Sequence, residues 1–209
     1  MSGPYSEPRR ERQGSGYPRA MHERDGVDEA RLRALLDELA AEFPRFRLVR
    51  KDRSFVQRSI ARLLALTTLG AQRSYLDRFV TTIGQRVYVP RHWERWPAVD
   101  RCLVLRHQRV HLRQFRRFGL APLALAYLLL PLPLGLAWCR MRLERDAYAE
   151  SVRAAAERWG FAHVCDAAFR DRILAMFTSG AYGWMWPFPS SLRRWYDALL
   201  ASLPAADEG

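Results

Sequence analysis

Two histidines, His107 and His111, lie four residues apart in the segment RHQRVHLRQ. Residues at this spacing share one face of an α-helix, so both imidazoles can bind a single metal ion. The apolar run CLVL at 102–105 precedes the pair and predicts that the helix is buried, and buried imidazoles need polar partners. The pair therefore indicates a metal site, and the alternative is two ordinary helical histidines.

A third ligand is available on the next predicted helix. Glu144, in the segment RMRLERDAY, places a carboxylate where it can complete a site of two histidines and one carboxylate. Zinc sites of this composition keep a fourth position for water and are typically catalytic. Zinc is therefore the cofactor that we expect.

These residues, together with a predicted β-hairpin before the histidine helix, resemble the gluzincin division of zinc metallopeptidases. That family carries His-Glu-x-x-His on one helix and a Glu on a later helix, and the resemblance covers about residues 76–150. It implies a zincin-like fold, a peptide or protein substrate, and zinc held by His107, His111 and Glu144. Asp146 is the second choice for the third ligand, and His163 is a weaker one.

The sequence departs from the family at the residue after the first histidine, which is Gln108 and not Glu. The family's Glu acts as the general base, and an amide cannot accept a proton in that role. The chain is therefore predicted to be an impaired peptidase. Asp146 or Glu150 could replace the base, or Gln108 could be an engineered substitution. One alternative function is a non-catalytic binding or regulatory module, and another is a membrane-surface protein with structural histidines.

Three further residues are candidates for roles around the metal. Gln114 lies seven residues after His107, close to the same helical face, where it can orient a ligand or simply be a polar surface residue. Tyr148 and Tyr182 can stabilise an oxyanion if they project into a cleft, and core packing is the alternative for both.

The pattern of apolar residues predicts an α+β fold that is mostly helical, with a small hairpin or sheet before the metal-binding helix. Turn residues separate the elements. We expect helices over 28–43, 54–69, 93–118, 139–159, 164–178 and 191–202, and strands over 46–51 and in the hairpin 78–90.

The segment 119–138 is almost wholly apolar and is flanked by arginines on both sides. Its prolines and the basic residues at both ends argue against a straight membrane span. It is predicted to be buried or to contact a membrane surface. A formal net charge of +12 is compatible with an anionic membrane surface, whereas nucleic-acid binding is not expected because no motif for it is present.

The composition of the N-terminal residues and the cysteine content predict the domain boundaries and the cellular compartment. Residues 1–27 are rich in Gly, Pro, Ser and Arg and are expected to form a disordered basic tail, followed by a single domain over 28–205. The cysteines Cys102, Cys139 and Cys165 are too few and too widely spaced for a disulfide framework. With no apolar leader at the N-terminus, a cytoplasmic location is expected, with peripheral or monotopic membrane association as a further option.

Overall fold

The computed structural model describes residues 19–53, 80–123, 138–179 and 185–204. These residues fall into two compact units, the first ending at Leu112 and the second beginning at Arg113. The boundary lies inside a continuous helix, α4 (Ala98–Phe118). Because two units that share a helix can belong to one domain, the single domain over 28–205 stays a prediction.

The first unit contains a small sheet of three strands. Strands β2 (Thr81–Ile83) and β3 (Arg86–Val89) form an antiparallel hairpin. Its turn contains Gly84 at φ +60°, a conformation that glycine adopts without strain. Strand β1 (Arg47–Arg50) pairs with β3 in parallel, so the order across the sheet is β1-β3-β2. The predicted strand and hairpin are both confirmed.

Helix α1 (Arg19–Glu42) packs in the first unit through apolar side chains that recur at helical spacing. It begins at Arg19, earlier than the expected start near Asp28. Leu32, Leu35 and Leu39 are buried, as is Phe43 just after the helix, whereas Leu36 is partly exposed. Spacings of three and four residues place the buried leucines on one face.

Two ion-pair groups join α1 to α4 within the first unit. The guanidinium of Arg109 donates to Glu38 Oε2 at 2.7 Å and to Glu42 Oε2 at 2.6 Å, and these two acids lie one turn apart on α1. Arg101 pairs with Glu29 nearer the start of α4. A guanidinium bridging two carboxylates in a partly buried position fixes the register of the two helices more firmly than a single surface pair.

The start of α4 differs from the expected boundary at Trp93. Residues Trp93–Arg95 form a separate 3-10 turn, η2, and Trp96 is extended. The residue before a proline is disfavoured in the helical conformation, so Pro97 forces the break and α4 starts at Ala98. The helix ends at Phe118, as predicted. Gly119 follows at φ +82° and its N–H donates to the carbonyl of Phe115, which is a common helix termination.

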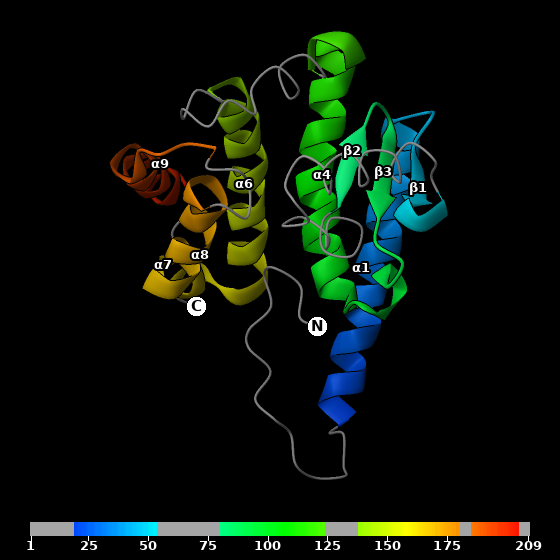
Figure 1. Cartoon of the computed structure of the whole chain (residues 1–209). Helices are drawn as coiled ribbons and strands as arrows, with labels where there is room; N and C mark the ends of the chain where they lie inside the picture. The colour runs from blue at the N-terminus through cyan, green and yellow to red at the C-terminus, as the bar shows by residue number, and fades with distance from the viewer. Residues whose placement is uncertain (1–18, 54–79, 124–137, 180–184, 205–209) are drawn as a thin grey trace. The chain divides into compact units, whose positions relative to one another are not determined.

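The regular elements that the structure describes in the second unit are helices (Figure 1). Helix α6 (Trp138–Trp159) matches the predicted span, and α9 (Pro189–Ala201) begins with a proline at its first turn. A single helix is expected over 164–178, but the structure has two helices in this region. They are the short α7 (Phe161–Cys165) and α8 (Ala167–Thr178). The break occurs because Asp166 is extended and its Oδ1 accepts from the N–H of Phe169, which makes it the N-cap of α8.

Several expectations fall outside the described residues. These are the tail up to residue 18, the helix over 54–69, the apolar stretch 124–137 and Tyr182. Among the helices that the structure does describe, none has the length and apolar character needed to cross a membrane. The mostly helical α+β class is confirmed.

Lys51 follows β1 in the 3-10 turn η1 (Lys51–Arg53), and its side chain is fully buried. It is the only lysine in the sequence. Burial lowers the pKa of its ammonium group from 10.5 to about 7, because the charged form loses hydration. An arginine would keep its charge at this position, whereas a lysine can release a proton.

Lys51 should make the stability of the protein depend on pH. Between about pH 7 and pH 10.5 the unfolded chain binds more protons at Lys51 than the folded chain. The free energy of unfolding should therefore rise with pH across this window, by up to about 1.4 kcal/mol per pH unit. Urea unfolding at several pH values measures the slope. The variant Lys51→Met should have a smaller slope, and equal slopes in the two proteins would contradict the assignment.

Candidate metal centre

The two histidines lie together on the same face of α4. Their Nε2 atoms are 3.2 Å apart, and both side chains are buried, with 7% of each exposed. Two imidazole nitrogens bound tetrahedrally to one zinc are separated by about 3.3 Å, because each Zn–N bond is about 2.0–2.1 Å long. The same separation is a hydrogen bond when one Nε2 carries a proton and the other accepts it.

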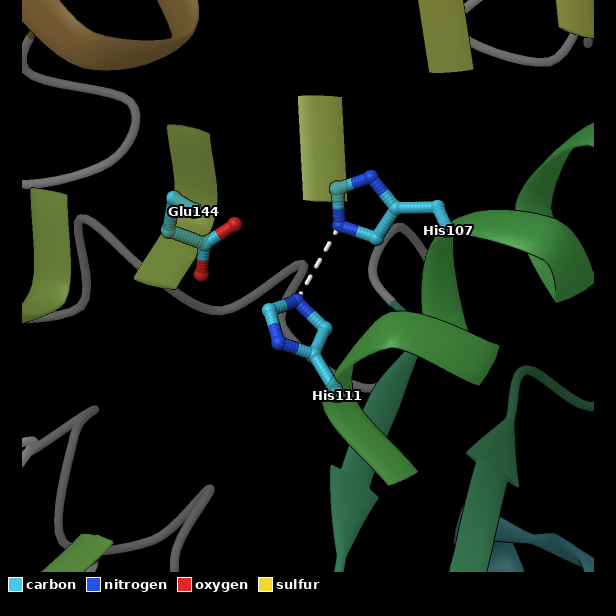
Figure 2. A group of neighbouring side chains, drawn as sticks. All are labelled: His107, His111 and Glu144. Atoms are coloured by element: carbon cyan, nitrogen blue, oxygen red, sulfur yellow. Dashed lines mark hydrogen bonds between the residues drawn. The ribbon is translucent and has the colours of Figure 1, made fainter. Parts of the chain in front are cut away.

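Glu144 of α6 completes the group. One ligand atom from each of His107, His111 and Glu144 lies within 4.8 Å of the others. Figure 2 shows the carboxylate pointing toward the two imidazole rings. Two neutral imidazoles and one carboxylate are a donor set that zinc accepts, and the three side chains therefore fit a metal ion.

The structure distinguishes Glu144 from the other proposed third ligands. Asp146 is exposed and is not a member of the group. His163 lies in α7, where its ring contacts Trp159 and Phe169 with centroid distances of 4.9 Å each. The group that the described residues form is the one in which Glu144 is the carboxylate.

Gln108 is buried and its amide is engaged. The hydroxyl of Thr82, in β2, donates to Gln108 Oε1 at 2.7 Å. This bond joins the edge strand of the described sheet to the helix that carries the histidines, one residue from His107. The amide oxygen of Gln108 is therefore already used as a hydrogen-bond acceptor.

Gln114 is also buried, and its amide nitrogen donates to the carbonyl oxygen of Leu143 at 3.0 Å. Leu143 directly precedes Glu144 on α6. Within the second unit, this bond joins the last turns of α4 to the backbone beside Glu144. Gln114 is therefore placed to orient Glu144 through the main chain. It is not a polar surface residue.

Tyr148 is buried, and its ring packs against Phe177 with centroids 5.1 Å apart. This contact belongs to the core of the second unit, which favours the packing alternative. A role for its hydroxyl at an oxyanion stays a prediction. Glu150 lies 4.0 Å from Arg153 on the solvent side of the same helix, and the group of ligand atoms does not include it.

Sequence reasoning missed three features around this centre. The only sequence signal for the bond between Thr82 and Gln108 is the alternation of the strand TTI, which places Thr82 on the inward face. The pairing of Arg109 with Glu38 and Glu42 joins residues distant in sequence and has no local pattern. The burial of Lys51 had no signal, because a lysine at the end of a strand is ordinarily exposed.

No family model, curated protein or solved structure matches the chain. The resemblance to gluzincins therefore stays an interpretation of the motif.

Gln114 yields a test of the centre that does not depend on catalysis. The variant Gln114→Leu removes the donor to the Leu143 carbonyl and should weaken zinc binding by roughly 10–100-fold, the usual effect of losing a group that orients a ligand. Zinc affinity is measured by competition with a chromophoric chelator. Arg113→Gln, at the exposed neighbouring position, serves as the control and should bind zinc normally. Unchanged affinity in folded Gln114→Leu would contradict the positioning role.

Proposed function

We propose that the protein is a zinc-binding, metallopeptidase-like protein in which His107, His111 and Glu144 hold the ion. The observation that carries this proposal is the 3.2 Å separation of the two buried Nε2 atoms with a carboxylate in the same group. When bound, zinc would supply Lewis-acid polarisation of a carbonyl and a more acidic water. Peptide-bond hydrolysis is the reaction that this donor set most often serves.

Strand β2 supports a peptide or protein as the molecule that is bound. It lies at the edge of the described sheet, and Thr82 within it contacts the residue next to His107. An extended peptide that added to this edge would form main-chain hydrogen bonds and run beside the histidines. The strand therefore gives the proposed site a way to align an extended ligand.

Gln108 determines how much hydrolysis is expected. Its amide cannot accept a proton from water, and its oxygen already accepts from Thr82. Loss of a general base typically costs about 10²–10⁴-fold in rate, so the protein should be a poor peptidase. The engaged amide favours a second candidate function, a non-catalytic module that keeps the metal and the edge strand in order to bind or regulate a partner.

Metal analysis tests the centre directly. The purified chain, loaded with zinc and dialysed, should retain about one ion per chain, as a mononuclear three-ligand site would. His107→Ala and Glu144→Gln should each lose most of it. His92→Ala is the matched control, because His92 is a partly exposed histidine outside the group. Circular dichroism checks that each variant folds. Zinc content that is low, or indifferent to His107→Ala, would overturn the proposal.

The role of Gln108 is tested by restoring the carboxylate. Gln108→Glu should raise the rate of peptide hydrolysis by about 10²–10⁴-fold, since Glu can take the proton that the amide cannot. The Thr82 hydroxyl can donate to the new carboxylate as it does to the amide. Hydrolysis of a mixed peptide library, followed by mass spectrometry, measures the gain.

The matching control is the double variant His107→Ala with Gln108→Glu, which should be inactive because a metal ligand is gone. Equal activity in the original chain and in Gln108→Glu would show that Gln108 does not limit catalysis. No activity in a zinc-loaded Gln108→Glu protein would favour the binding module.

A further inference from the structure

Large apolar side chains are exposed where α4 ends and α6 begins, within the second unit. Phe118 is 48% exposed, Leu120 55% and Trp138 54%. Among the described residues only two other large apolar side chains are comparably exposed, Val27 and Phe188. Three of these five exposed side chains therefore lie close to the end of α4 or the start of α6. Scattered apolar residues need no explanation, but a group of them marks an interaction site.

The hydrogen bond between Gln114 and Leu143 brings these side chains to the same end of the two helices. It pairs a position four residues before the end of α4 with one five residues after the start of α6. The bond therefore places the last turn of α4, which ends at Phe118, near the first turns of α6, which begins at Trp138. Figure 1 shows the last turn of α4 and the first turn of α6 at the same end. We call Phe118, Leu120 and Trp138 the apolar end patch.

The surroundings of the apolar end patch are strongly basic. From 113 to 143 the sequence contains five arginines and no Asp or Glu, and the stretch 124–137 has no charged residue at all. The arginines are Arg113, Arg116, Arg117, Arg140 and Arg142. A second copy of the chain would bring the same positive charges to the same face, which disfavours self-association through it.

Two of these arginines contact the aromatic rings of the patch. The guanidinium carbon of Arg117 lies 5.2 Å from the centroid of Phe118, and that of Arg142 lies 5.8 Å from the centroid of Trp138. A ring with a guanidinium beside it suits the boundary between lipid headgroups and acyl chains, where the ring enters the apolar layer and the cation stays with the phosphates. Leu120 adds apolar surface that could not stack on a nucleic-acid base.

We propose that the apolar end patch docks the protein on the surface of an anionic lipid bilayer, with the flanking arginines paired to lipid phosphates. The side chains of the patch would enter the bilayer surface without crossing it. The inference is independent of the proposed zinc function, since none of the patch residues belongs to the metal group.

Vesicle sedimentation tests the docking. The full chain should bind vesicles of phosphatidylcholine with about one third phosphatidylglycerol much more tightly than vesicles of phosphatidylcholine alone, and high salt should weaken binding. Removing three surface charges in Arg116→Gln, Arg117→Gln, Arg142→Gln should weaken binding roughly a hundredfold. The matched control removes three exposed arginines elsewhere in the same unit. It is Arg153→Gln, Arg193→Gln, Arg194→Gln, and it should bind nearly as well as the original chain.

The apolar contribution is tested in the same way. Phe118→Ser with Leu120→Ser should weaken binding about tenfold or more, since each side chain loses most of its transfer free energy. Phe188→Ser is the control, because Phe188 is equally exposed but lies outside the patch. Circular dichroism, measured for every variant, shows that the fold is intact and keeps this result separate from the zinc proposal.

Trp138 provides a direct probe of the site. Its fluorescence should shift to shorter wavelength when vesicles are added, and Trp138→Phe should reduce the shift while binding is largely kept. Three results would overturn the proposal: no binding to anionic vesicles, equal loss in the two triple-arginine variants, which would show a general effect of net charge, or a stable dimer that the serine variants dissociate. Tighter binding to RNA than to vesicles would likewise assign the patch to another partner.

Discussion

The Nε2 atoms of His107 and His111 lie 3.2 Å apart in a buried position, and the surrounding elements are arranged around that pair. Two buried imidazole nitrogens at this separation can share a proton in a hydrogen bond or bind one cation. Their separation follows from the α-helix, whose turn brings residues four apart onto one face. Keeping the pair aligned with Glu144 therefore requires a straight, well-anchored α4.

That anchoring comes from contacts on the other faces of α4. Arg109 lies on a different face from the histidines and bridges Glu38 and Glu42 of α1. Thr82 donates to Gln108 from β2, and Gln114 donates to the backbone of α6 beside Glu144. The bonds of Gln108 and Gln114 satisfy buried amide groups, so these residues stabilise the fold and also lie beside the site. The Gln108 amide therefore accepts a hydrogen bond from Thr82 but cannot act as a base.

The basic residues have different uses along the chain. With 34 basic residues and one lysine, nearly all of the positive charge is arginine. Arg101 and Arg109 form ion pairs with acids of α1, where a planar guanidinium can bind two carboxylates. Other arginines flank the apolar end patch within the stretch 113–143, which contains no Asp or Glu. The single lysine occupies a fully buried position, where the ability to lose a proton lowers the cost of burial.

The sequence by itself determined what depends on short spacing. It predicted the shared face of His107 and His111, the hairpin around Gly84, the span of α6 and the end of α4 at Gly119, because helical periodicity and turn residues act over a few positions. It also named Glu144 as the third member of the group, with Asp146 as the second choice. The tertiary structure decided that Glu144 and not Asp146 joins the histidines, that Thr82 occupies the Gln108 amide and that Lys51 is buried. These facts join residues far apart in sequence, where packing and burial, and not local preference, choose the partner.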